Sequence, residues 1–291
     1  MADVRPMVVD DIPEACDVWE RAFADLRVRF NLPAHARDAA ADARFDTRIR
    51  HFLTHDAGGA WVSHEDDRVT GLAVALQRER VWVLSMLGVD PMAQSSGVGR
   101  ALLERTLAYG DADGPGIILS SRDPRAMRRY ALAGFALRPA VTAWGRLRRA
   151  GLPAVRGVRA GSEADLDLAA HVDRLQRGAA RGPDYAVLLA DGGRMLVFDE
   201  GARRGYTIVR ENDRPVVLAA TDPEVATALL TEALAGLPDD GDVEVGWLTA
   251  SQQWAVQLCL AAGLELHPVG GVMVRGHPGP MSPYLPNGMS G

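Results

Sequence analysis

The hydrophobic pattern changes within residues 81–110 from that of a strand to that of a helix. The run from Val81 to Val89 is almost wholly apolar and ends at Asp90-Pro91, which predicts a buried strand. The next six residues, Gln94 to Gly99, are small and polar. From Val98 onward apolar residues recur at three- and four-residue spacing, the period of an amphipathic helix. We therefore expect a strand, a loop and a helix in direct succession.

The remainder of the first half follows an alternating order of strands and helices. Period-two patterning predicts strands at 4–6, Ala60–His64, Val69–Gln77 and Gly116–Ser121, and a final strand pair through Val141 and Trp144. Capped starts predict helices from residue 10, from about Ala36 to His55, and from Pro124, where Asp123 is the cap. An antiparallel hairpin, together with a parallel strand after each helix, predicts a mixed sheet and a three-layer α/β fold.

The second half repeats this order of elements. A strand at Val158-Arg159 and a capped helix start are followed by strands at 195–198, 206–209, 215–219 and 243–248, and by helices at 225–235 and 252–262. We therefore expect two domains, 1–147 and 157–276, joined by a linker at 148–156. The Pro- and Gly-rich tail, 277–291, has the composition of a disordered segment, and docking over the first domain is the alternative.

The loop at Gln94–Gly99 has the features of a phosphate-binding loop. A strand that feeds a glycine-containing loop and a helix presents free backbone N–H groups at the positive end of the helix dipole. Gly97 and Gly99 allow close approach of a ligand, and Arg100 can add a charged contact. The Walker A motif is excluded because the chain contains no Lys, and the dinucleotide motif is excluded because Leu102 stands where its third Gly would be.

Two motifs resemble those of the GCN5-related N-acetyltransferases, the GNAT superfamily. QSSGVG is similar to the Q/R-x-x-G-x-G/A signature of the pyrophosphate loop, and DPRAMRRYALAGF, 123–135, resembles a second family segment, with Asp123 in place of the usual Asn. The resemblance implies two tandem GNAT-like domains, each a mixed, mostly antiparallel sheet flanked by helices. It implies acetyl-CoA as co-substrate and no metal, with cofactor contacts from Leu87, Gly88, Val89, Gln94, Ser95, Ser96, Gly97, Val98, Gly99, Arg100 and Asp123.

The same resemblance suggests how the first domain would work. In the family the strand corresponding to 81–89 splays from its neighbour at a bulge, and the pantetheine arm lies in the gap; Gly88 suits such a bulge. Tyr130 is the expected catalytic acid, beside the thioester sulfur, with a core tyrosine as the alternative. The first two helices would wall the acceptor site, although Trp19 and Phe23 also fit a plain core role.

The general base is left open by the sequence. The candidates are Glu79, His51, His55, a water held by Ser85 and, if the tail docks, a C-terminal carboxylate. Arg125, Arg128 and Arg129 share a helical face that suits either a CoA 3′-phosphate or solvent.

The second copy of the repeat lacks the residues of the loop. At the position of QSSGVG it has Ala220 to Val225, without glycine, and Asp222 and Glu224 bring negative charge to the place of a pyrophosphate. Leu258 or Cys259 stands where the first copy carries Tyr130. We therefore expect a degenerate C-terminal domain and one active site in the N-terminal domain.

Charge and cysteine content narrow the class of protein. A net charge of -6 argues against nucleic acid as the main partner, no apolar run reaches the roughly 20 residues of a membrane span, and the first residues lack signal-peptide order. Two isolated cysteines fit buried thiols of a cytoplasmic protein. The expected acceptor is a small-molecule amine or a peptide, and a homodimer is possible. An acyl-CoA sensor without catalysis and an enzyme that uses a longer acyl-CoA are the alternatives.

Overall fold

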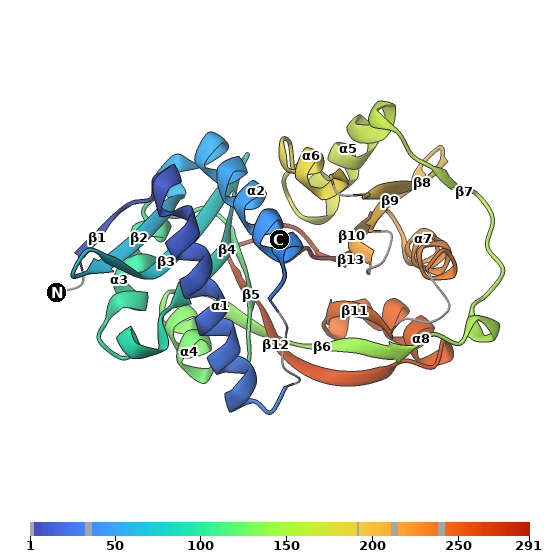
Figure 1. Ribbon diagram of the computed structural model, residues 1–291. Coiled ribbons are helices and arrows are strands. Elements are labelled where there is room, and N and C mark those ends of the chain that lie inside the picture. The colour runs from blue at the N-terminus through green and yellow to red at the C-terminus, as the bar shows by residue number, and fades with distance from the viewer. Residues whose placement is uncertain (1–2, 33–36, 191, 211–214, 238–241) are drawn as a thin grey trace. The chain divides into compact units, whose positions relative to one another are not determined.

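The computed structural model describes residues 3–32, 37–190, 192–210, 215–237 and 242–291. Their contacts divide the chain into two compact units. Unit 1 comprises Met1–Gln77 and Trp82–Gly114, and unit 2 comprises Arg78–Val81 and Pro115–Gly291. Figure 1 shows the elements of both units in chain order. The division places residues 115–147 in unit 2, and the predicted linker at 148–156 stays a prediction.

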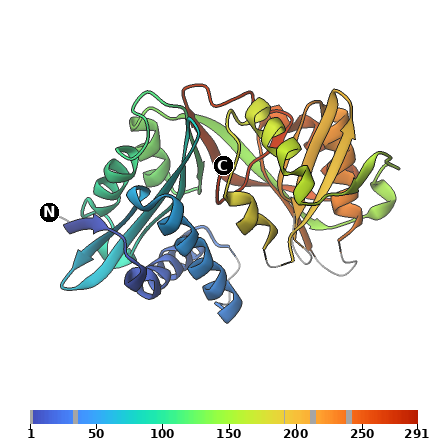
Figure 2. The ribbon, with the colours of Figure 1, turned by 90° about the horizontal axis from the view of Figure 1, so that it is seen from above.

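Unit 1 is a sheet covered by helices on both faces. Its strands run in the order β1 (Asp3–Pro6), β2 (Ala60–Glu65), β3 (Arg68–Arg78) and β4 (Val81–Val89), and β1 and β3 both pair antiparallel with β2. Helices α1 (Ile12–Arg29) and α2 (Ala39–His55) cover one face and α3 (Val98–Leu107) covers the other (Figure 2). The helix predicted from about Ala36 begins at Ala39, with Asp38 as its N-cap; Ala36 itself lies outside the described residues.

Strand β4 changes the faces of its side chains partway along. The indole of Trp82 donates a 2.9 Å hydrogen bond to the carbonyl of Thr106 in α3, whereas a Cβ on Gly88 would lie 3.3 Å from the ring of Trp19 in α1. In a regular strand, residues six apart lie on the same face, because side chains alternate with period two. An irregularity therefore interrupts the alternation between Trp82 and Gly88, as a β-bulge does.

Unit 2 contains the remaining helices and two groups of strands. One group has the order β5-β12-β6-β11 and the other β13-β10-β9-β8-β7. The strands are β5 (Gly116–Ser120), β6 (Ala136–Arg146), β7 (Val158–Ala160), β8 (Arg194–Glu200), β9 (Arg203–Val209), β10 (Pro215–Ala220), β11 (Asp242–Leu248), β12 (Glu265–Arg275) and β13 (Tyr284–Leu285). The helices are α4 (Pro124–Leu132), α5 (Leu166–Gln176), α6 (Asp184–Leu189), α7 (Pro223–Ala235) and α8 (Gln253–Ala261). Apolar side chains from α7, α8 and the facing strands form a continuous core cluster.

The final strand pair expected through Val141 and Trp144 is wrong. Residues 136–146 form one strand, β6, which pairs antiparallel with β12 on one side and with β11 on the other. Strand β12, which the sequence analysis missed, also pairs with β5. Strand β12 of the second half thus lies between two strands of the first half, β5 and β6.

An equivalent Arg–Asp ion pair lies near the start of each half of the chain. Arg5 donates two hydrogen bonds to the carboxylate of Asp11, at 2.6 and 2.8 Å, and the N–H of Val8 donates a third. Six residues also separate Arg159 from Asp165, which accepts from that guanidinium at 2.6 and 3.0 Å and from the N–H of Ser162. The strand-to-helix opening therefore repeats in its side chains as well as in its pattern.

The pairing in the second half predicts a pH dependence of stability. Hydrogen bonds from Arg159 lower the pKa of Asp165 to about 2, against 3.8 in the unfolded chain. A lowered pKa stabilises the fold fully above pH 4, and this contribution is lost as the pH falls through 2. The half-exposed Arg159 reduces the effect to about 1 kcal/mol. In thermal unfolding, the difference between wild type and Asp165→Asn should shrink between pH 5 and pH 2. A constant difference would contradict this assignment.

The C-terminal tail is ordered, contrary to the expected disorder. Tyr284, Leu285, Met289 and Ser290 are buried, and β13 pairs with β10 in unit 2. The composition of the tail predicts disorder because it has no periodic apolar face. Its few apolar side chains are nevertheless buried, and a buried side-chain network binds its end.

Candidate functional site

The N-terminus of α3 has the backbone that a bound anion requires. Gly97 is the N-cap with φ +96°, and no side chain among the described residues caps this helix. Ser95 also has a positive φ of 70°, so the chain turns sharply before the helix. Ser95, Ser96 and Gly97 are exposed. The first N–H groups of α3 therefore lie at the positive end of the helix dipole without a side-chain cap from the described residues.

Two polar side chains of the loop bind the loop itself. The amide of Gln94 donates to the carbonyl of Val89 at 3.2 Å, and the hydroxyl of Ser96 donates to the carbonyl of Ala93 at 2.6 Å. Gln94 thus ties the loop back to the end of β4. These two hydrogen bonds fix the shape of the loop, and a ligand contact by either side chain stays a prediction.

Leu87 and Val89 point away from the face that carries α1. Both pack against the buried cluster of Ala73, Ala93, Val98 and Leu102, beneath α3. A Cβ on Gly99 would lie 3.3 Å from Val89, which shows how closely α3 approaches β4. Because these two side chains are occupied by packing, their expected cofactor contacts would have to come from the main chain.

Asp90 anchors the loop, a role that the sequence analysis missed. One carboxylate oxygen accepts from the N–H of Met92 at 3.0 Å, and the other accepts from Arg21 of α1 at 2.8 Å. The signal was present in the sequence, because Asp followed by Pro is typical of a turn start.

This anchor predicts a moderate effect on ligand affinity. Asp90→Ala removes the cap and the ion pair, an expected loss of about 1 kcal/mol in ordering the loop, so acetyl-CoA should bind about fivefold more weakly. Asp25→Ala, which removes an ion pair within α1, is the matched control and should leave the affinity unchanged. Isothermal titration measures both, and equal affinities for wild type and Asp90→Ala would refute the anchoring role.

Arg100 binds within its own helix. Its guanidinium pairs with Glu104 at 2.7 Å, and both side chains are mostly exposed. Exposed pairs of this kind contribute little to stability, so exchanging Glu104 for a ligand phosphate would cost little. Phosphate binding by Arg100 remains a prediction.

Asp123 and Tyr130 lie in unit 2, on α4. Asp123 is the predicted N-cap of this helix: it accepts from the N–H of Arg125 at 2.9 Å and pairs with the Arg125 side chain. Tyr130 is 6% exposed, and burial raises the pKa of its phenol above the ordinary value. Its hydroxyl therefore stays protonated throughout the neutral range, as a proton donor must.

The face of β4 toward α2 carries an arginine that the sequence gave no reason to select. Arg48 donates to the hydroxyl of Ser85 at 2.7 Å and to its carbonyl at 3.2 Å. Nearby on α1, the rings of Trp19 and Phe23 stack with centroids 4.2 Å apart, and both are half-buried. Ser85, one of the groups considered for holding a water, thus faces a cation.

The other base candidates are distributed over both units. His51 and His55 stack on α2 with ring centroids 4.7 Å apart. Glu79 belongs to unit 2 and pairs with Arg174 at 2.8 Å. The main-chain oxygen of Gly291 accepts from Arg181 and Tyr284 inside unit 2. The contacts of Glu79 and Gly291 disfavour them as bases, since both groups are held by a guanidinium.

The corresponding helix of the second half carries its own cap. Asp222 accepts from the N–H groups of Glu224 and Val225, at 3.1 and 3.0 Å. Burial alone would raise the pKa of the Asp222 carboxyl, but these hydrogen bonds and the nearby Arg203 lower the pKa below its ordinary value. A carboxylate therefore occupies the N–H groups of α7 that a phosphate would need.

The described residues contain no group of three or more His, Cys, Asp or Glu side chains placed to hold a metal ion. No helix formed by them has the length and apolar character needed to cross a membrane.

Comparisons with known proteins connect these features to a family. Residues 19–135 match the sequence model of the acetyltransferase (GNAT) family. A search of curated protein sequences found no match. The fold resembles that of a candidate acetyltransferase from Pyrococcus horikoshii, with 17% identity, a TM-score of 0.76, and coverage of 100% of this chain and 96% of the other.

Two further structures share the arrangement over nearly the whole chain. A tandem GNAT protein from the clavulanic acid biosynthesis pathway has 16% identity and a TM-score of 0.56, with 94% of this chain and 98% of the other covered. A GCN5-related N-acetyltransferase from Sphaerobacter thermophilus has 14% identity and a TM-score of 0.60, covering 94% and 95%. The predicted fold class is confirmed. Residues 19–135 thus match the GNAT family model, and the chain shares the fold of tandem GNAT structures.

Proposed function

We propose that the chain is an N-acetyltransferase, which moves the acetyl group of acetyl-CoA directly to an amine at a site in its N-terminal half. The single observation that carries this proposal is the uncapped start of α3, with Gly97 at φ +96°, directly after β4. This arrangement matches the binding requirements of a pyrophosphate. The GNAT match over residues 19–135 supports an acyl-CoA as the ligand.

The proposed contacts divide by type of group. Main-chain N–H groups of residues 97–99 would hold the pyrophosphate, with the Arg100 side chain as an additional cation. The β4 segment of Leu87, Gly88 and Val89 would bind the pantetheine arm through its backbone, since two of these side chains pack beneath α3. When bound, acetyl-CoA supplies the activated thioester, and the chain supplies position and charge.

Tyr130 is proposed to give its proton to the sulfur as the thiolate leaves. The bond from the amine nitrogen to the acetyl carbon forms and the carbon–sulfur bond breaks. The amine must be neutral to attack, so its own proton passes to water or to a base of this chain. Because burial raises the pKa of Tyr130, its phenol is protonated before the transfer and can donate this proton.

One active site per chain is proposed. In the second half, Asp222 caps the N-terminus of α7. The residue that corresponds to Tyr130 is Leu258 or Cys259 of α8, and both of these are buried and apolar. Both cysteines are buried and free of disulfides, which supports the proposed cytoplasmic location. The acceptor is proposed to be a small amine or a peptide amine.

A non-catalytic acyl-CoA sensor is the second candidate. It is favoured by the pairing of Ser85 with Arg48 on β4, where some GNAT enzymes carry a carboxylate base. The deciding experiment follows thiol release from acetyl-CoA across a panel of amines, amino acids and peptides. Amine-dependent release establishes the enzyme, and binding with no release above that of protein alone establishes the sensor. The same panel with propionyl- and butyryl-CoA tests the longer-acyl alternative.

A further inference from the structure

The C-terminal segment 283–291 adds a strand to the second half. Leu285 and Tyr284 lie opposite Leu218 and Ala219 of β10 in an antiparallel pair. The N–H of Ala220 donates to the carbonyl of Pro283 at 3.3 Å, and the side-chain amide of Asn287 donates to the carbonyl of Val216 at 3.0 Å. This segment therefore binds β10 along most of its length, on the side opposite β9.

The place of this segment has a counterpart in the first half. Strand β10 precedes α7 as β4 precedes α3, and β11 precedes α8 as β5 precedes α4. Strands β10 and β11 belong to different sheets, and β13, which pairs with β10, also lies against β11. The segment thus occupies the gap between the two strands that correspond to β4 and β5, the gap where the first half is proposed to bind pantetheine.

The chain just before β13 passes the start of α8. The side-chain amide of Gln252 donates to the carbonyl of Met281 at 2.8 Å, and the hydroxyl of Ser282 donates to the carbonyl of Ser251 at 2.9 Å. Residues 281–287 therefore contact both β10, which corresponds to β4, and the turn that leads into α8, the helix that corresponds to α4. In addition, Asp222 caps α7, the helix that corresponds to α3.

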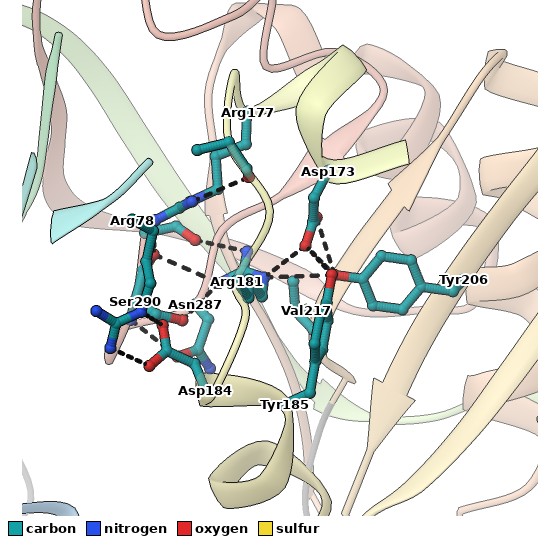
Figure 3. Close-up of polar contacts among 12 residues, drawn as sticks. Arg78, Asp173, Arg177, Arg181, Asp184, Tyr185, Tyr206, Val217, Asn287 and Ser290 are labelled. Carbon is teal, nitrogen blue, oxygen red and sulfur yellow. Dashed lines mark hydrogen bonds and ion pairs between the residues drawn. The ribbon is translucent and has the colours of Figure 1, made fainter. Parts of the chain in front are cut away.

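A buried network of polar side chains holds the end of the segment. Arg181, fully buried, donates to the main-chain oxygen of Gly291 at 2.6 Å and to the hydroxyls of Ser290 and Tyr284. Arg177, also fully buried, donates to the carbonyl of Ser290 at 2.7 Å. Figure 3 shows both guanidiniums directed at the end of the chain.

A carboxylate and two phenols surround the Arg181 guanidinium in turn. Asp173 lies 3.3 Å from Arg181 and accepts from the hydroxyls of Tyr185 and Tyr206. Burial raises the pKa of Tyr206, so this phenol stays a donor. This network forms a rigid receptor, because displacing one partner would leave further polar groups buried and unpaired.

We propose that residues 283–291 act as a permanent internal ligand that fills the acyl-CoA cleft of the second half. The segment makes the strand-edge contacts that pantetheine would make there, and the Arg177–Arg181 receptor keeps it in place. The second half is therefore closed to acyl-CoA by an occupant as well as by sequence changes in its loop. The identity of the excluded ligand rests on the proposed function; the permanence of the occupant does not.

Hydrogen exchange of the full-length protein tests this directly. The amides of Ala220, Leu285 and Ser290 should exchange as slowly as those of β9, and saturating acetyl-CoA should leave their rates unchanged. Exchange of 283–291 at the rate of a free tail, or faster exchange when acetyl-CoA is added, would overturn the proposal. The ligand-free measurement is independent of catalysis, so its outcome is separate from that of the proposed function.

A pair of variants extends the test. Asn287→Ala removes the bond to Val216 and the contacts of its side-chain oxygen with the N–H groups of Met289 and Ser290. It should speed exchange of residues 288–291 about tenfold and leave β9 unchanged. Ser282→Ala, which removes one exposed hydrogen bond, is the control and should change neither. Equal effects of the two variants would show that the segment is not held as proposed, and a second acetyl-CoA site in wild type would show that the cleft is open.

Discussion

Gly97→Glu should weaken acetyl-CoA binding by about 100-fold or more and leave the fold intact. The backbone at Gly97 has φ +96°, a conformation that costs a residue with a Cβ about 1–2 kcal/mol. The new carboxylate would also lie at the uncapped N-terminus of α3, where it competes with phosphate for the same N–H groups. Space is not the limit, because among the described residues no atom lies within 4 Å of a Cβ at this position.

A second substitution separates charge from backbone strain. Gly97→Asn introduces a side chain that tolerates positive φ and carries no charge, so it should weaken binding by only a fewfold. Isothermal titration gives the affinities, and thermal unfolding checks that both variants fold. Wild-type affinity in Gly97→Glu would place the phosphate site elsewhere.

Tyr130→Phe should lower kcat about 100-fold while the affinity for acetyl-CoA stays within twofold of wild type. Loss of a positioned proton donor typically costs 10²–10⁴ in rate, whereas the ring, 6% exposed, keeps its packing. Because burial raises the pKa of Tyr130, the acid form persists as the pH rises. The wild-type rate should therefore show no decline up to pH 10 from loss of this proton.

The matched control is Tyr109→Phe. This tyrosine donates its hydroxyl to Asp56 at 3.0 Å, so its loss should lower stability and leave kcat unchanged. Equal kcat for wild type and Tyr130→Phe would make Tyr130 a core residue, the alternative role considered for it.

Local patterns predicted most of the elements around the site. The strand at Val81–Val89 and the helix from Val98 were confirmed with their predicted bounds, and Asp123 caps α4 as expected. These elements depend on neighbouring residues: apolar spacing, a turn at Asp90-Pro91, and glycines where the backbone needs positive φ. Their roles in binding follow from the family resemblance and stay predictions.

The features that the sequence analysis missed depend on contacts between distant residues. Strand β12 pairs with β5 and β6 across more than 120 residues, and no local pattern specifies such a partner. The tail looks disordered by composition, yet Arg181 binds it from about 110 residues away. The hydrogen bond between Arg48 and Ser85 depends on the packing of α2 against β4, which the local sequence does not specify.

The central claim is that one half of a tandem fold binds acetyl-CoA and the other is closed. Isothermal titration of the wild-type chain with acetyl-CoA measures the number of sites directly. The account predicts one site per chain, removed by Gly97→Glu and unaffected by Asn287→Ala. Two sites per chain would contradict the closed second half, and no binding would leave the GNAT fold of this chain without its expected co-substrate.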